Sequence, residues 1–92
     1  MIQTFGNDET EKIFLRERVK IFEKFERIVL RKLEMLHAAI SISDLKIPPG
    51  NRLEKLQGKR SEYYSIRIND QWRICFAWKD GNAYEVQIED YH

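Results

Sequence analysis

The stretch Tyr63-Tyr-Ser-Ile-Arg-Ile-Asn-Asp-Gln-Trp-Arg-Ile-Cys-Phe-Ala-Trp78 alternates apolar and polar side chains on either side of an Asn-Asp-Gln break. Residues 64–68 and 72–78 therefore predict two antiparallel strands that share one apolar face. Residues 84–88 repeat the pattern after the turn residues Asp80-Gly81-Asn82, which adds a third strand to the meander. A shift of one residue would move all side chains of a strand to the other face, so the shared apolar face restricts the register.

That restriction selects the loop lengths. A two-residue turn after Ile68 would put the apolar side chains of the first two strands on opposite faces, whereas a three-residue loop at residues 69–71 keeps them together. A five-residue loop at residues 79–83 does the same for the last strand. The predicted pairs are Ile68–Trp72, Ile66–Ile74, Arg67–Arg73, Trp78–Tyr84, Cys75–Gln87 and Arg73–Glu89.

The first half of the chain predicts helices. Residues 1–6 alternate weakly and predict a short strand, and Asn7 or Asp8 then predicts the start of a helix near residues 8–16. A longer amphipathic helix follows, since apolar residues recur at steps of three and four: Phe22, Phe25, Val29, Leu33, Leu36 and Ile40. His37 lies in its last turn, where a cation is favourable, and is not read as a ligand.

The connector to the sheet contains Pro48-Pro49-Gly50-Asn51, which excludes a continuous helix. A helical turn at residues 43–46, capped by Ser43, and a short strand at residues 52–56 are predicted around it. The expected architecture is α+β, with two N-terminal helices packed on one face of a small, mostly antiparallel sheet.

Length and composition favour one cytoplasmic domain spanning residues 1–92. The single cysteine, Cys75, excludes an intramolecular disulfide and is interpreted as a packing residue. We expect no membrane segment or signal peptide, because no apolar run is long enough. Two histidines and one cysteine predict no metal site, and four scattered glycines predict no phosphate loop and no cofactor.

The predicted register places Arg67 beside Arg73 on the face opposite the core. Two like charges in that position destabilise a sheet, so they require compensation. Glu89 across from Arg73 would supply a structural ion pair, whereas an anion such as phosphate would be held by both guanidinium groups. Residues 52–73 carry six basic and three acidic residues, which fits either a solvated surface or a modest basic patch.

The chain ends in Asp90-Tyr91-His92, an acid, a phenol and an imidazole that extend the last strand. All three side chains can transfer protons, and histidine does so near neutral pH. Polar residues at a terminus are also commonly just solvated, so the motif alone does not define a site.

Three stretches together resemble a HigB-type toxin of the RelE/ParE toxin–antitoxin superfamily: Asn51 to Arg60, Asn69 to Phe76 and Glu89 to His92. The resemblance also includes Tyr64-Ser-Ile-Arg67 and the helical first half, and it covers essentially the whole chain. It implies a RelE-like fold with a basic cleft on the face that the helices leave open. It also implies an mRNA endonuclease that enters the ribosomal A site, needs no metal and inhibits translation.

The implied chemistry is attack by an RNA 2′-hydroxyl on its own phosphate, which leaves a cyclic phosphate. Arg73 would stabilise the developing charge, while Asp90, Tyr91 and His92 would position the hydroxyl and transfer protons. The residues expected to hold RNA are Lys55, Gln57, Lys59, Arg60 and Arg67. The family pattern has a lysine where this chain has Gln57, so the expected cation is replaced by a hydrogen-bonding amide.

The resemblance further implies a helix-turn-helix antitoxin as partner, with operator DNA bound only through the toxin–antitoxin complex. Two alternatives stay open. ParE-like relatives of the same fold inhibit DNA gyrase without cleaving RNA, and a degraded relative would bind only its antitoxin.

Overall fold

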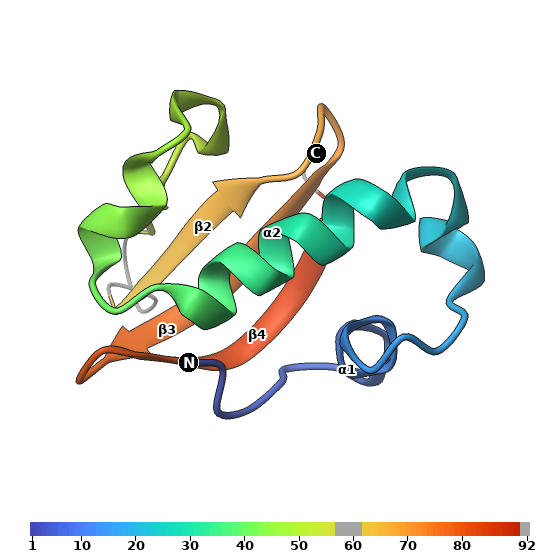
Figure 1. Ribbon diagram of the computed structural model, residues 1–92, viewed down its shortest axis with the longest axis horizontal. Coiled ribbons are helices and arrows are strands. Elements are labelled where there is room, and N and C mark those ends of the chain that lie inside the picture. Colours follow the sequence, from blue (N-terminus) through green and yellow to red (C-terminus); the bar gives the residue numbers. More distant parts are fainter. Residues whose placement is uncertain (57–61, 91–92) are drawn as a thin grey trace.

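The computed structural model describes residues 1–56 and 62–90, and four antiparallel strands form one sheet in the order β1-β2-β3-β4 (Figure 1). The strands are β1 (Glu54–Lys55), β2 (Tyr63–Arg67), β3 (Trp72–Lys79) and β4 (Asn82–Asp90). The meander predicted from the alternating pattern is confirmed. The strand predicted at residues 52–56 is present but contains only two residues.

The β2–β3 register agrees with the prediction from side-chain alternation. Ile66 pairs with Ile74, and Arg67 pairs with Arg73. Ile66 and Ile74 are fully buried. The strict period of two, combined with one buried face, was therefore sufficient to fix this pair of strands.

The β3–β4 register follows the prediction only in its first half. Arg73 pairs with Glu89 and Cys75 with Gln87, but Ala77 then pairs with Tyr84. The predicted Trp78–Tyr84 pair and the five-residue loop are wrong, because Asp80 and Gly81 alone form the turn. Both have positive φ, 52° and 78°, as a tight type I′ hairpin requires.

A β-bulge reconciles this short turn with the buried face. The register shifts between Cys75 and Ala77, and Glu85 in the opposing stretch adopts a φ of 51°. The extra residue keeps Val86 and Ile88 in the core and places Ala83 there too, each at most 5% exposed. Tyr84, predicted on the apolar face, is instead only half-buried.

Helix α2 (Glu26–Ala38) lies across one face of the sheet (Figure 1). Val29, Leu33 and Leu36 on its apolar side are fully buried, as the spacing predicted. The segment before α2 is a 3-10 helix, η1 (Lys20–Phe25). Among the described residues, no helix is long and apolar enough to cross a bilayer. Ile40 does not continue the buried stripe: α2 ends at Ala38, the next residue is extended, and Ile40 is 82% exposed.

Helix α1 (Asp8–Phe14) lies at the outer edge of β4 (Figure 1). Asn7 caps it by accepting a hydrogen bond from the Thr10 amide at 3.0 Å. The buried Thr10 hydroxyl in turn accepts a hydrogen bond from the Ile88 amide at 2.9 Å. The α1–β4 contact is therefore built on a hydrogen bond as well as on apolar packing.

The segment predicted as a first strand, residues 1–6, runs parallel to β4 but forms only isolated bridges. Ile2 bridges to Ala83 and Phe5 to Val86. The amides of Gln3 and Gly6 donate to carbonyls of β4, and each of these bonds is 2.8 Å long. The segment thus covers the outer edge of the last strand.

The connector after α2 contains two further 3-10 helices, η2 (Ile42–Lys46) and η3 (Pro49–Asn51). Ser41, not the predicted Ser43, caps η2 in a reciprocal capping box with Asp44. The connector runs beside β2, which η3 contacts directly (Figure 1).

Candidate functional site

Arg73 is the second residue of the inner strand β3, on the face opposite α2, and is only 5% exposed. Its Nε donates to the Ser65 hydroxyl at 2.9 Å, and its Nη2 donates to the Arg52 carbonyl at 2.8 Å. A buried guanidinium requires such acceptors, because burial without them would cost several kcal/mol. These contacts hold the charged group in one orientation.

A hollow of about 200 Å³ opens beside this guanidinium. Its lining combines one cation, one hydroxyl, one thiol, one apolar side chain and three carboxylates: Glu54, Leu56, Ser65, Arg73, Cys75, Glu89 and Asp90. A planar cation facing a small polar hollow is suited to hold an oxyanion such as phosphate. Carboxylates at the same hollow are able to accept a proton or to compete for the cation.

Glu89 lies opposite Arg73 in the register, as predicted. Glu54 on β1 also approaches Arg73, with its Oε1 at 4.0 Å from Nη2. Glu54 has a half-exposed side chain, so water screens this pair. The structural ion pair and the phosphate site considered from the sequence are therefore compatible, since the same guanidinium faces carboxylates and the hollow.

Asp90 is the final residue of β4 and lies opposite Trp72. It lines the hollow with Arg73 and accepts a hydrogen bond from the Gln71 side chain at 3.1 Å. The structure therefore brings together two of the four residues predicted as catalytic. The other two, Tyr91 and His92, lie outside the described residues.

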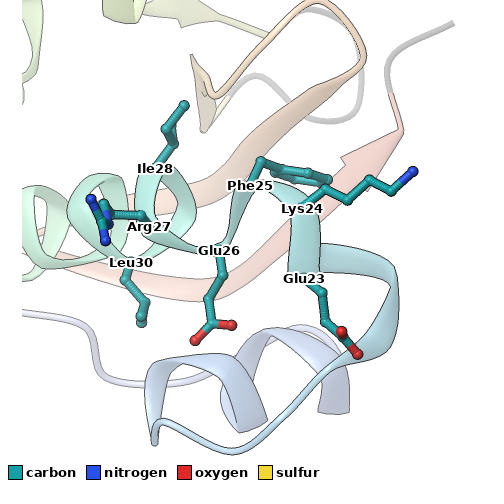
Figure 2. A pocket seen from close by; sticks show the side chains of 7 residues that line it. All are labelled: Glu23, Lys24, Phe25, Glu26, Arg27, Ile28 and Leu30. Atoms are coloured by element: carbon teal, nitrogen blue, oxygen red, sulfur yellow. The ribbon is translucent and has the colours of Figure 1, made fainter.

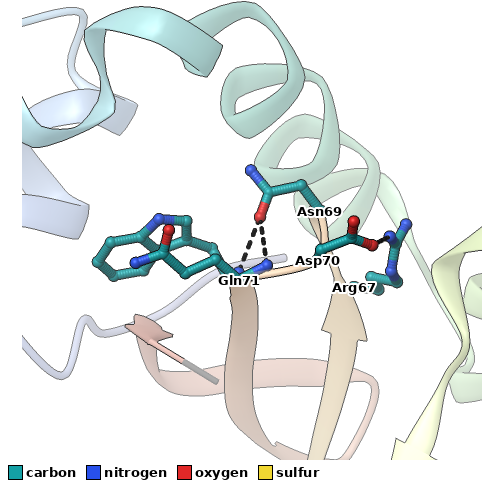
Figure 3. A network of polar contacts seen from close by, with 5 residues as sticks. Arg67, Asn69, Asp70 and Gln71 are labelled. Atoms are coloured by element: carbon teal, nitrogen blue, oxygen red, sulfur yellow. Dashed lines mark hydrogen bonds and ion pairs between the residues drawn. The ribbon is translucent and has the colours of Figure 1, made fainter. Parts of the chain in front are cut away.

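Arg67 pairs with Arg73 along the backbone, but its guanidinium forms an ion pair with Asp70 in the β2–β3 loop (Figure 3). Asn69 stabilises the same loop by accepting hydrogen bonds from the amides of Gln71 and Trp72, at 2.9 and 2.8 Å (Figure 3). Arg67 does not line the hollow at Arg73. The two guanidinium groups predicted to grip one phosphate are thus directed to different partners.

The other residues predicted to hold RNA divide into two groups. Lys55 is exposed on β1 and does not line the hollow. Gln57, Lys59 and Arg60 lie outside the described residues. Of these four residues, the structure therefore locates only Lys55, on the edge strand β1, and the other three stay predictions.

Sequence reasoning missed Ser65 and Glu54 as neighbours of Arg73. Both follow from the register: Ser65 pairs with Cys75 and with Glu54, so all three lie near Arg73. For Glu54 the missing signal was the β1–β2 pairing, which a two-residue strand does not reveal by periodicity. Ser65 could have been found from the predicted β2–β3 register, which pairs it with Cys75.

A second, more open hollow of about 530 Å³ lies where η1 meets α2 (Figure 2). Glu26 and Leu30 project to one side of the ribbon there and Ile28 to the other (Figure 2). Its charged residues are two acids and two bases: Glu23, Glu26, Lys24 and Arg27. They lie away from Arg73 and form no cluster suited to catalysis, so the smaller hollow is the better candidate.

Within residues 1–56 and 62–90, no three His, Cys, Asp or Glu side chains are grouped to hold a metal ion. The chemistry that the described residues can provide is hydrogen bonding, charge stabilisation by Arg73 and proton transfer by carboxylates.

Solved toxin structures share this fold. The structure of a YoeB dimer from Staphylococcus aureus matches with a TM-score of 0.62 at 22% identity. The match covers 99% of this chain and 94% of the YoeB chain. YafQ from E. coli has a TM-score of 0.66 at 13% identity, with 98% and 93% covered. At these identities the likeness defines the class of fold, a RelE-like α+β toxin fold, as predicted.

Sequence comparison defines the family more closely. Residues 3–92 match the HigB-like toxins, described as the RelE-like toxin of the type II toxin–antitoxin system HigB, and the chain belongs to this family. It is similar to Toxin HigB-1 of Vibrio cholerae serotype O1, with 48% identity over 64 residues, 70% of this chain and 67% of that protein. It is also similar to Endoribonuclease HigB of Proteus vulgaris, 44% identical over 41 residues and 45% of each chain.

Proposed function

We propose that this chain is the toxin of a type II toxin–antitoxin system and cleaves mRNA on the ribosome. The observation that carries the proposal is the buried Arg73, which faces a hollow shared with Asp90 in a chain of the HigB-like family. The relative from Proteus vulgaris that is named an endoribonuclease supports the same activity.

The proposed reaction is an in-line displacement at phosphorus. The RNA 2′-oxygen attacks the adjacent phosphate, the 5′-oxygen leaves, and a 2′,3′-cyclic phosphate and a 5′-hydroxyl end are formed. Arg73 stabilises the negative charge that grows on the phosphate oxygens, a role that is worth about 10²–10³ in rate for one well-placed donor. No metal takes part.

Two proton transfers complete the reaction. One group takes the proton of the 2′-hydroxyl, and another gives a proton to the leaving 5′-oxygen. Asp90, Tyr91 and His92 are the candidates for these roles. Lys55, Gln57, Lys59, Arg60 and Arg67 would hold the RNA backbone, with Gln57 contributing hydrogen bonds in place of a cation.

The proposal includes partners and organisation. Residues 1–92 act as one cytoplasmic domain, a helix-turn-helix antitoxin neutralises it, and the complex of the two binds operator DNA. A toxin–antitoxin heterotetramer, YoeB–YefM from Staphylococcus aureus, has the same toxin fold and supports a protein antitoxin as partner.

The test is cleavage of mRNA on programmed ribosomes by protein used either as purified or after treatment with EDTA and removal of the chelator. Purified wild-type protein should cut within the reading frame in both conditions, leave cyclic phosphate ends, and fail to cut the same mRNA without ribosomes. Arg73→Ala should cut about 10²–10³-fold more slowly while remaining folded. Induced growth arrest with intact mRNA and a DNA damage response would replace this proposal with gyrase inhibition, and normal growth would indicate a chain that only binds its antitoxin.

A further inference from the structure

Lys32 is a charged residue inside the protein that the proposed reaction does not use. It lies on α2 and is only 8% exposed. Burial, and then the nearby charges of Arg31 and Arg67, lower the pKa of its ammonium group. Its Nζ donates to Oδ1 of Asn51, a neutral acceptor, and it forms no ion pair within the described part of the chain.

Asn51 connects Lys32 to the segment before β1. It is fully buried, and its Nδ2 donates to the carbonyls of Leu45 and Ile47 at 3.1 and 3.4 Å. The same nitrogen lies 3.1 Å from the sulfur of Met35 on α2. One amide side chain therefore fastens the connector to the helix from both of its polar atoms.

The next residue, Arg52, connects this anchored segment to the candidate site. Its backbone is left-handed, with φ 44° and ψ 57°, which a residue other than glycine retains only when its surroundings hold it. Its amide donates to the Pro49 carbonyl at 3.1 Å, and its own carbonyl accepts the 2.8 Å hydrogen bond from Arg73 Nη2. The anchored residue and the acceptor of Arg73 are thus adjacent in the chain.

We propose that Lys32 and Asn51 are positioning residues for Arg73: they fix the Arg52 carbonyl, which in turn orients the guanidinium toward the hollow. The consequence for RNA cleavage rests on the proposed function, whereas the consequence for the guanidinium does not. A displacement of about 1 Å at a reacting group can cost on the order of 10²-fold in rate, so a distant anchor is able to control activity.

The first test measures the guanidinium directly. In protein labelled with ¹⁵N-arginine, the Arg73 N–H signals are assigned by their loss in Arg73→Lys. Lys32→Met retains the buried stem but removes the donor to Asn51, and should speed exchange of these N–H groups with water about tenfold, as expected when one hydrogen bond no longer restrains the group. Arg27→Met, an exposed change on the same helix, is the matched control and should leave the exchange unchanged.

Unchanged exchange in Lys32→Met would overturn the proposal. If that variant does not fold, Asn51→Asp replaces it, because it keeps an acceptor for Lys32 but removes the Nδ2 donor to the connector. The same rise in exchange is then expected, and wild-type exchange in the folded variant would equally overturn the proposal.

The second test measures cleavage on programmed ribosomes, well below each variant's melting temperature. Lys32→Met should lower kcat about tenfold and leave KM within about twofold, since it misplaces Arg73 without removing an RNA contact. A variant that only lost stability would keep the wild-type kcat at this temperature. If wild type itself does not cleave, the proposed function fails, and the exchange measurement still decides whether Lys32 positions Arg73.

Discussion

Arg67 and Arg73 lie directly opposite each other on β2 and β3, but their guanidinium groups have separate partners. Arg67 pairs with Asp70 in the loop, whereas Arg73 is held by the Ser65 hydroxyl and the Arg52 carbonyl. This divergence removes the like-charge repulsion that a direct cross-strand pair would suffer. Of these two arginines, Arg73 lines the hollow and Arg67 does not.

The two arginines should therefore respond differently to removal. Arg73→Ala should reduce kcat for mRNA cleavage by about 10²–10³-fold, because it removes a donor to the transition state. Arg67→Ala should change mainly KM, by less than about tenfold, and should reduce the salt dependence of binding by roughly one phosphate contact. Steady-state cleavage at several salt concentrations measures both effects. Equal losses of kcat would show that both guanidinium groups serve the reaction.

Glu54 should weaken RNA binding in the wild-type protein. Its carboxylate lies 4.0 Å from Arg73 Nη2 and competes with phosphate for that cation. Glu54→Gln should lower KM about twofold to fivefold, the range expected for a half-exposed ion pair. Glu62→Gln, an exposed change of the same kind outside the hollow, is the matched control. A rise in KM for Glu54→Gln would show that the carboxylate helps to orient Arg73 instead.

Gly81 should be required for its backbone conformation. Its φ is 78°, and an added Cβ would lie 3.4 Å from the Ile40 carbonyl oxygen, an ordinary contact. Gly81→Ala should therefore lower the free energy of unfolding by about 1 kcal/mol through backbone strain alone. Gly81→Asn should cost less, because asparagine tolerates the left-handed region. Denaturant melts of the three proteins measure the order, and equal stability of all three would contradict the strained turn.

Asp44 should make stability depend on acid pH. Its carboxylate accepts hydrogen bonds from the amides of Ile40 and Ser41, at 3.0 and 3.2 Å, and these bonds lower its pKa below the ordinary 3.8. The unfolded chain therefore binds the proton first as pH falls, so this contribution is present above pH 3.8 and is lost as pH falls through the folded pKa. In Asp44→Asn, the free energy of unfolding should fall less steeply as the pH is lowered below about 4, as denaturant melts at several pH values will measure. An unchanged fall would mean that the cap contributes nothing.

Much of the sheet could be predicted from the sequence, because a buried face makes the period of two a strict constraint. That constraint gave the Arg67–Arg73 and Arg73–Glu89 pairs correctly. It did not distinguish a five-residue loop from a two-residue turn followed by a bulge, since both keep Val86 and Ile88 on the same face. The choice depended on Asp80 and Gly81 both adopting positive φ.

The candidate site was predictable only in its strand residues. Periodicity located Arg73, but it gives no direction for a long side chain, so the pairing of Arg67 with Asp70 was not foreseen. Glu54 depended on the pairing of a two-residue strand, which leaves no pattern, whereas Ser65 was within reach of the predicted β2–β3 register. The apolar spacing of the helix gave no signal for Lys32, whose burial depends on its hydrogen bond to Asn51 in the distant connector.

The segment at residues 1–6 forms backbone hydrogen bonds with residues 83–86, and the Thr10 hydroxyl accepts a hydrogen bond from the Ile88 amide. Residues 1–10 are therefore held in place by β4, which is distant in the sequence. Contacts of such long sequence separation cost more loop-closure entropy than local contacts and form more slowly. The same strand, β4, provides the partners that cover the outer edge of the sheet and two carboxylates of the hollow, Glu89 and Asp90. A chain without β4 would therefore lack both the closed outer edge and the carboxylates of the hollow, so the two features form together.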